Sequence, residues 1–139
     1  MYNKSMVLFA LLLSFSLAFS YCFEQAGVYY RVSPSLLYAI AKVESGLNPY
    51  ALNRNSNGTY DIGLMQINSR WIPVLKRYGL YDGRYIWEPC YNTMVGAWVL
   101  RQCMERYGYS WKAVDCYNKG SKARENSRYV WRVYYSLVR

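Results

Sequence analysis

Apolar residues recur every three or four positions over most of the chain beyond residue 22, and this spacing predicts helices. Ser33 and Pro34 are typical of a helix start, because serine can cap the first turn and proline fits its first position. Gly46 is typical of a helix end. The pattern predicts helices at 23–31, at 34–45, at 68–78, at 89–107, from Ser110 to about 118–120, and from Asn126 or Ser127 onward.

Three of these helices have a pattern that predicts their orientation. Residues 94–100 are apolar on all sides, so 89–107 is expected to be the buried central helix. In the first helix, Ala26, Tyr29 and Tyr30 are expected to face inward. The last helix carries an apolar stripe at helical spacing, formed by Tyr129, Val130, Val133, Tyr134 and Leu137.

Residues 50–62 interrupt the helical period. Asn57-Gly58 is a strong hairpin signal, and Tyr60 and Ile62 are expected in a short strand after it. The sequence therefore predicts a mainly α (α+β) fold with one small β-hairpin.

The N-terminal residues follow a different pattern. Lys4 precedes an apolar run at 7–15, and small residues lead up to Ser20, which is the arrangement of a secretory signal peptide. We therefore expect a signal peptide at 1–20 and a single domain at 21–139. A membrane anchor is the alternative, although the apolar run is short for a helix that spans a bilayer.

Four cysteines follow the predicted signal peptide, and an even number of cysteines in an exported chain indicates disulfides. Three pairings are possible on paper. We favour Cys22–Cys90 and Cys103–Cys116, because the second pair would join consecutive helices. Metal binding is the alternative, but the chain has no histidine and no Cys-x-x-Cys pair, so no metal site is expected.

The net charge of +9 suits a polyanionic partner, either a nucleic acid or an anionic cell-wall polymer. Export favours the wall polymer. The basic residues are scattered rather than clustered, so we expect no nucleic-acid partner. Most of the 17 tyrosines are expected to fill the core, and a few near a site would serve as platforms for sugars.

Glu44 is the candidate for chemistry, since it shares one helix face with apolar Leu37, Ile40 and Ala41. It also lies in the last turn, where the helix dipole is negative. Both the desolvation and the dipole raise the pKa of a carboxyl group, as a general acid requires. The alternative is a glutamate at a helix end that is paired with Lys42 or an arginine.

Two segments around Glu44 resemble a known family. The stretch 41–49, AKVESGLNP, resembles the Glu-Ser motif of soluble-type lytic transglycosylases, and 63–67, GLMQI, resembles their second motif. Two later segments resemble the third and fourth motifs: 113–120, which contains Tyr117-Asn118, and 129–133, YVWRV. The four motifs follow the family's order.

Two further features narrow the resemblance. Four cysteines after a signal peptide in a short chain are similar to the invasion-associated muramidases that accompany type III secretion systems. Asp61 and the residues after it are similar to C-type lysozyme, in which the corresponding aspartate is the second catalytic carboxylate. The resemblance implies a lysozyme-like, disulfide-bonded fold, a periplasmic location, a monomer, and a partner in a secretion apparatus.

The resemblance also implies an activity: cleavage of the β-1,4 bond from N-acetylmuramic acid to N-acetylglucosamine in peptidoglycan, without a cofactor. It implies Glu44 as the catalytic acid and base, with Asp61 as a second carboxylate. For Asp61 the alternative is a turn aspartate bound to the hairpin backbone. The resemblance further implies substrate contacts from Ser45, Met65, Gln66, Tyr117, Asn118 and Tyr129.

For most of these substrate contacts a structural role is the alternative: local capping for Ser45, bracing of the hairpin for Gln66, and core packing for the tyrosines. Lys119 departs from the family's third motif, which usually has alanine there. A lysozyme-like hydrolase and a cell-wall-binding module without activity are the other possible functions.

Overall fold

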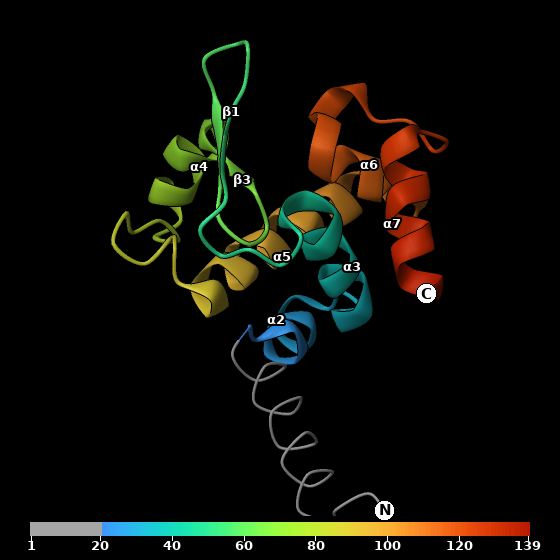
Figure 1. The fold of residues 1–139 in the computed structure, drawn as a ribbon, viewed down its shortest axis with the longest axis horizontal. Coiled ribbons are helices and arrows are strands. Elements are labelled where there is room, and N and C mark those ends of the chain that lie inside the picture. Colours follow the sequence, from blue (N-terminus) through green and yellow to red (C-terminus); the bar gives the residue numbers. More distant parts are fainter. Residues whose placement is uncertain (1–20) are drawn as a thin grey trace, which may run out of the picture.

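The computed structural model describes residues 21–139. The predicted signal peptide at 1–20 lies outside the described residues. Six α-helices, three strands and two 3₁₀ helices make up the described part (Figure 1): α2 (Phe23–Tyr30), α3 (Pro34–Ser45), β1 (Leu52–Arg54), β2 (Tyr60–Ile62), β3 (Ile67–Asn68), η1 (Ser69–Trp71), α4 (Ile72–Arg77), α5 (Pro89–Tyr107), α6 (Trp111–Lys119), η2 (Gly120–Lys122) and α7 (Arg128–Val138). This order confirms the mainly α fold with a small β element.

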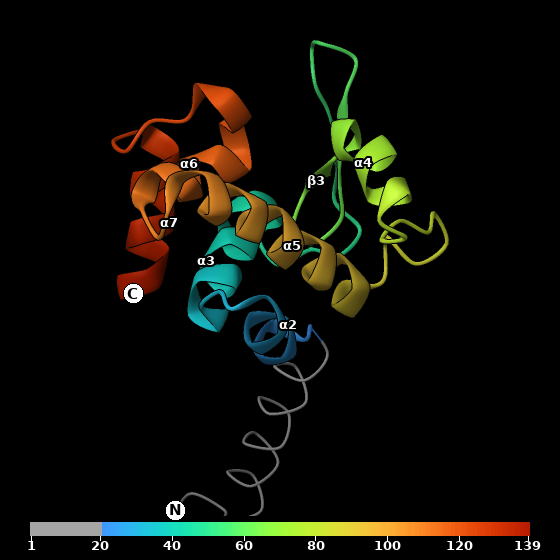
Figure 2. The same cartoon turned by 180° about the vertical axis from the view of Figure 1, so that it is seen from behind.

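Helix α5 is the centre of the molecule. Seen from behind, it crosses the front of the molecule from below α4 to α6 (Figure 2), and it contacts α2, α3, α6 and β3. Gly96 gives this helix a flat surface, because a Cβ there would lie only 2.8 Å from the side chain of Met65. The predicted central helix is confirmed in both its position and its bounds.

The capping residues determine where the helices begin and end. Ser33 accepts a hydrogen bond from the Leu36 N–H at the start of α3, and Gly46 ends that helix with a φ of 63°. Ser127 accepts a hydrogen bond from the Val130 N–H at the start of α7, so it is Ser127 rather than Asn126 that caps the last helix.

The strands form an antiparallel sheet in the order β1-β2-β3. The predicted Asn57-Gly58 turn joins the first two strands, and Gly58 has a φ of 83°. In the register of the sheet, Asp61 lies between Asn53 on one side and Asn68 on the other. This register surrounds the aspartate with amide side chains.

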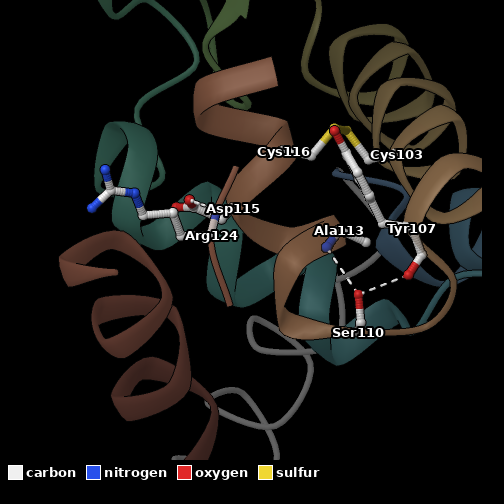
Figure 3. Close-up of a disulfide and its surroundings, with 7 residues drawn as sticks. All are labelled: Cys103, Tyr107, Ser110, Ala113, Asp115, Cys116 and Arg124. Carbon is white, nitrogen blue, oxygen red and sulfur yellow. Dashed lines mark hydrogen bonds between the residues drawn. A yellow bond between two sulfur atoms is a disulfide. The ribbon is translucent and has the colours of Figure 1, made fainter. Parts of the chain in front are cut away.

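Both disulfides have the favoured pairing, Cys22–Cys90 and Cys103–Cys116. The second joins α5 to α6 (Figure 3). Beside it the Ser110 hydroxyl donates to the Tyr107 carbonyl at 3.0 Å and accepts from the Ala113 N–H at 3.2 Å. The cap fixes the start of α6, and the disulfide holds its second half, which carries part of the site described below.

Two expectations are corrected. The ring of Tyr29 is 71% exposed, so it does not face inward, whereas Ala26 is buried as expected. The predicted helix at 68–78 is shorter, because Asn68 belongs to β3 and η1 precedes α4. Within residues 21–139 no helix combines the length and the apolar character that crossing a membrane requires.

Candidate active site

A groove with a cavity volume of about 550 Å³ lies between the sheet and α6. It brings together residues from widely separated segments: the end of α3, the hairpin, η1, the middle of α5 and the end of α6. Its lining residues are Glu44, Asn55, Ser56, Asn57, Asp61, Gln66, Ile67, Asn68, Arg70, Trp71, Val99, Cys116, Tyr117, Asn118, Lys119 and Gly120. Both predicted carboxylates therefore line one groove.

Glu44 enters the groove from the last turn of α3. The apolar residues on the same face, Leu37, Ile40 and Ala41, are fully buried in the core, so this face of the helix points inward as predicted. Burial is the main reason why the pKa of the Glu44 carboxyl rises from 4.5 to about 7. At neutral pH a large part of this group therefore carries a proton.

Four neighbours adjust the pKa of Glu44. The negative charge of Asp61 raises it further, while the Tyr129 hydroxyl, the Arg132 guanidinium and the Asn118 amide lower it. The Tyr129 hydroxyl is buried near the carboxyl, yet it forms no hydrogen bond of ordinary geometry within residues 21–139. Tyr129 and Asn118, which were predicted as site residues, thus lie beside Glu44.

Asp61 stands in a different environment. Its Oδ1 accepts a hydrogen bond from the Asn68 amide at 2.8 Å, and its Oδ2 accepts one from the Asn55 amide at 3.1 Å. Both amides also donate to the Thr59 hydroxyl, at 3.2 and 3.1 Å. The carboxylate is fixed by neighbouring side chains of the sheet and still lines the groove.

Tyr117 connects α6 to the segment after the hairpin. Its hydroxyl donates to the Met65 carbonyl at 2.6 Å, and burial raises the pKa of this tyrosine well above its ordinary value. The Met65 side chain is fully buried against Gly96 and does not line the groove. The substrate contact expected of Met65 stays a prediction; in the structure the residue offers its backbone oxygen to Tyr117.

Ser45 and Gln66 stabilise the turns around the groove. The Ser45 hydroxyl is 2.6 Å from the Leu64 carbonyl, accepts from the Asn48 N–H at 3.1 Å, and does not line the groove. The Ser45 side chain thus braces the backbone, as its alternative role predicts, and its substrate contact stays a prediction. Gln66 lines the groove, but its amide donates to the Gly63 carbonyl at 2.9 Å and its oxygen accepts from Asn53 at 2.6 Å.

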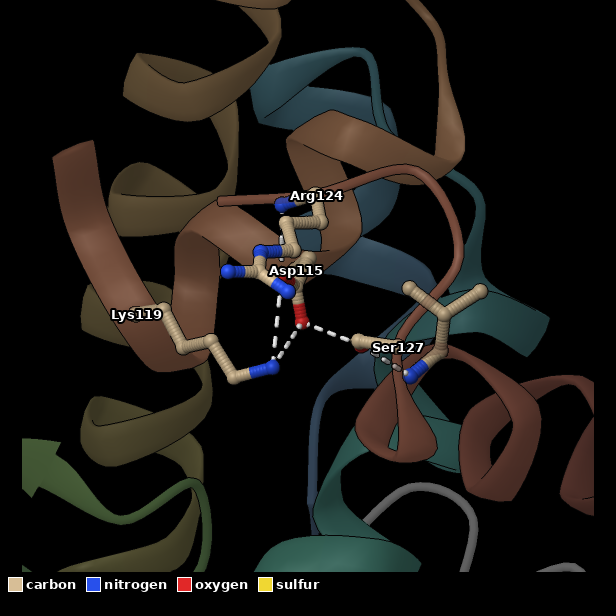
Figure 4. Close-up of polar contacts among 5 residues, drawn as sticks. Asp115, Lys119, Arg124 and Ser127 are labelled. Carbon is tan, nitrogen blue, oxygen red and sulfur yellow. Dashed lines mark hydrogen bonds and ion pairs between the residues drawn. The ribbon is translucent and has the colours of Figure 1, made fainter. Parts of the chain in front are cut away.

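Asp115 is a buried carboxylate that sequence reasoning missed (Figure 4). It accepts hydrogen bonds from the Ser127 hydroxyl at 2.5 Å and the Arg124 N–H at 2.7 Å, and it pairs with the Lys119 ammonium at 3.2 Å. The network joins α6, which carries Tyr117, to the cap of α7. In the sequence Asp115 follows the apolar residues 113–114, but direct neighbours do not share a helix face, so the spacing that identified Glu44 is absent here.

The remaining groove residues extend the site beyond the prediction. Asn55 and Asn68 were not predicted as site residues, nor were Arg70 and Trp71, which lie at the same rim. Lys119 lines the groove while its ammonium is paired with Asp115. Within residues 21–139 no three histidine, cysteine, aspartate or glutamate side chains gather as metal ligands.

Residues 21–131 match the family described as Transglycosylase SLT domain. Invasion protein IagB of Salmonella typhimurium is 39% identical over 132 residues, which cover 91% of this chain and 82% of that protein. Protein IpgF of Shigella sonnei is 38% identical over 121 residues, which cover 85% of this chain and 80% of that protein.

The fold is also found among solved structures. One of them is an inactive glutamate-to-glutamine mutant of the lytic transglycosylase Slt from Pseudomonas aeruginosa, with a TM-score of 0.67 and 20% identity. The similarity covers 84% of this chain and 22% of that longer chain.

Proposed function

Since the chain belongs to the Transglycosylase SLT domain family of peptidoglycan lytic transglycosylases, we propose that it cleaves the bond from N-acetylmuramic acid to N-acetylglucosamine and leaves a 1,6-anhydro end. The observation that carries this proposal is the Glu44 carboxyl in the groove, with its pKa raised to about 7. A group that titrates near neutral pH can both give and take a proton during one reaction.

The first step is proton transfer from the Glu44 carboxyl to the glycosidic oxygen. The bond from that oxygen to C1 of the muramic sugar breaks, and positive charge develops at C1. The acetamido oxygen of the same sugar stabilises this charge. The Glu44 carboxylate then takes the proton of the C6 hydroxyl, and the C6 oxygen bonds to C1, so no water is consumed.

Three neighbours support these steps. Tyr129 and Asn118 interact with the carboxylate form of Glu44, which they favour when the proton has left. Asp61 lies in the same groove and supplies negative charge where positive charge develops on the sugar.

Asp61 also supports a second candidate function, hydrolysis. A carboxylate in the groove can orient a water molecule toward C1, so that water rather than the C6 hydroxyl closes the reaction. This function differs from the first only in which oxygen attacks.

We further propose that the enzyme acts in the periplasm and opens the wall locally for a secretion apparatus. The signal-peptide pattern at 1–20 and the two disulfides support export. The name of the Salmonella relative, invasion protein, supports a role in a pathogen's contact with its host.

Mass spectrometry of digested sacculi tests the proposed reaction. We expect muropeptides with anhydro ends, which are lighter by one water molecule than hydrolysed ends and resist reduction by borohydride. The Glu44→Gln variant serves as the negative control. Reducible ends alone would establish hydrolysis instead, and identical products from both proteins would remove Glu44 from the mechanism.

A further inference from the structure

A second cavity lies on the surface between α3 and α7, which pack side by side (Figure 1). Its volume is about 390 Å³, and it is lined by Lys42, Val43, Arg132, Tyr135, Ser136 and Arg139. None of these residues lines the groove that contains Glu44. We call this cavity the α3–α7 pocket.

The α3–α7 pocket is lined by three cations and no acid. Lys42, Arg132 and Arg139 are absent from the ion pairs found within residues 21–139, and Arg132 acts on a carboxylate only at longer range, where it lowers the pKa of Glu44. Arg132 makes only a long hydrogen bond, 3.4 Å, to the Val43 carbonyl. The donors of these cations are available to an anionic group from outside, and arginine forks suit carboxylates.

Exposed aromatic rings continue the α3–α7 pocket along α7. Tyr135 is 50% exposed, and the Arg139 guanidinium lies 5.8 Å from its ring centroid. The ring of Trp131, 47% exposed, lies 5.9 Å from that of Tyr135 at an angle of 32°. Tyr134 and Trp111 extend the ring contacts to α6. A contiguous exposed aromatic surface of this kind indicates a binding site.

We propose that the α3–α7 pocket and the rings of Trp131 and Tyr135 bind the stem peptides of peptidoglycan, as a second site apart from the catalytic groove. This inference rests on the proposed function, because it takes the wall polymer as the ligand. Stem peptides carry free carboxylates at short intervals, which match the unpaired cations, and the sugars beside them offer apolar faces to the rings. Such a site keeps the enzyme on an insoluble polymer between cuts.

Co-sedimentation with insoluble sacculi tests the second site. The Glu44→Gln background prevents cleavage, and Tyr135→Ala with Arg139→Glu is added to it. We expect roughly tenfold weaker binding, because the change removes a ring and reverses a charge that carboxylates contact. The controls are Tyr29→Ala with Arg106→Glu, which remove an exposed tyrosine and reverse an arginine that lies 5.3 Å from another tyrosine ring.

Two further measurements test whether the stem peptide is the ligand and whether binding at the α3–α7 pocket is independent of catalysis. Sacculi whose stem peptides have been removed by an amidase should bind both proteins equally. In the enzyme that retains Glu44, the Tyr135→Ala and Arg139→Glu changes should leave the cleavage of short soluble glycans unaltered. A failure of the proposed reaction is then seen independently of binding.

Three results would overturn the proposal. The first is equal binding of the pocket variant and the control variant to intact sacculi. The second is a loss that persists on sacculi without stems. The third is a loss seen only with vesicles that contain phosphatidylglycerol, which would make the α3–α7 pocket a site for anionic lipid.

Discussion

The two carboxylates of the groove come from regions that are built in different ways. Glu44 ends a helix whose inner face is packed in the apolar core, and burial dominates its titration. Asp61 lies in the middle strand of a small sheet, where the Asn55 and Asn68 amides donate to its two oxygens. Two acids in one groove are thus given different properties by their surroundings, which is how one site can hold an acid and a charge stabiliser together.

The two regions also differ in how they are held in place. The helical region is cross-linked by disulfides and by the fully buried Asp115, which joins α6 to the start of α7. The hairpin is held by short strands and by hydrogen bonds between side chains such as Asn53 and Gln66. We infer that the helical region sets the chemistry and that the hairpin adjusts it.

The largest expected effect comes from the helical side. Glu44→Gln keeps the shape of the side chain and removes its proton chemistry, so the rate of wall lysis should fall by about 10²- to 10⁴-fold. Turbidity of a sacculus suspension measures this rate. Glu24→Gln, at an exposed position on α2, is the matched control and should retain full activity. Lysis by Glu44→Gln within a factor of two of the wild type would contradict the assignment.

The next effect belongs to the hairpin side. Asp61→Asn should slow the reaction by about tenfold to a hundredfold, because a stabilising charge is lost while the side chain keeps its shape. It should also lower the pKa of Glu44, since the charge of Asp61 raises that pKa, and the alkaline limb of the activity profile should move to lower pH. Asp82→Asn, in the loop before α5 and outside the groove, is the control.

Both the rate and the pH profile of Asp61→Asn can contradict the contrast between the helical region and the hairpin. An unchanged pH profile would mean that the two carboxylates do not interact. A rate as low as that of Glu44→Gln would mean that Asp61 takes part in proton transfer itself, and that the two regions do not have separate tasks.

A smaller effect concerns stability and pH. The folded protein binds a proton at Glu44 more tightly than the unfolded chain, because the pKa is about 7 against 4.5. This contribution to stability is fully present below pH 4.5 and is lost as the pH rises through 7. Relative to Glu44→Gln, the wild type should therefore lose on the order of 1–3 kcal/mol of unfolding free energy between pH 4 and pH 8.

Urea unfolding of both proteins at the two pH values measures this difference, with the disulfides intact. Subtracting the variant from the wild type removes the titration of the other groups. A difference that stays constant with pH would show that Glu44 titrates as it does in the unfolded chain, and the contrast between the two carboxylates would disappear.

Much of this contrast could be predicted from sequence, because it depends on local signals. Ser33 and Gly46 mark the ends of α3, and the spacing of apolar residues before Glu44 turns the acid toward the core. Asn57-Gly58 identifies the hairpin, and the order of the helices favours the Cys103–Cys116 pair among the possible pairings. Signals of this kind lie within a few residues of the feature that they predict.

Other features depend on contacts that no local pattern encodes. Strand β3 has only two residues, too few for an alternating pattern, so Asn68 was predicted in a helix rather than beside Asp61. Tyr29 has helical spacing, but spacing alone does not tell which side of a surface helix is buried. Two of the partners of Asp115, Arg124 and Ser127, come from the segment between α6 and α7, whose path is set by tertiary packing.

The smallest effect tests one of these missed contacts. Asn55→Ala removes the amide that donates to Asp61 Oδ2 at 3.1 Å and leaves the backbone bond from the Asn55 N–H to the Thr59 carbonyl in place. We expect a loss of about 1 kcal/mol in stability and a fall in activity of about fivefold. The pH profile should keep its midpoint, because Asn55 is not among the groups that shift the pKa of Glu44.

A double-mutant cycle decides whether Asn55 acts through Asp61. If the amide only holds the carboxylate in place, Asn55→Ala should cost much less activity in an Asp61→Asn background than in the wild type, so the two effects will not add. Additive effects would mean that Asn55, which also lines the groove, contacts the sugar directly. The orientation of Asp61 would then depend on the remaining donor, Asn68 at 2.8 Å, and Asn68→Ala would be expected to show the coupling instead.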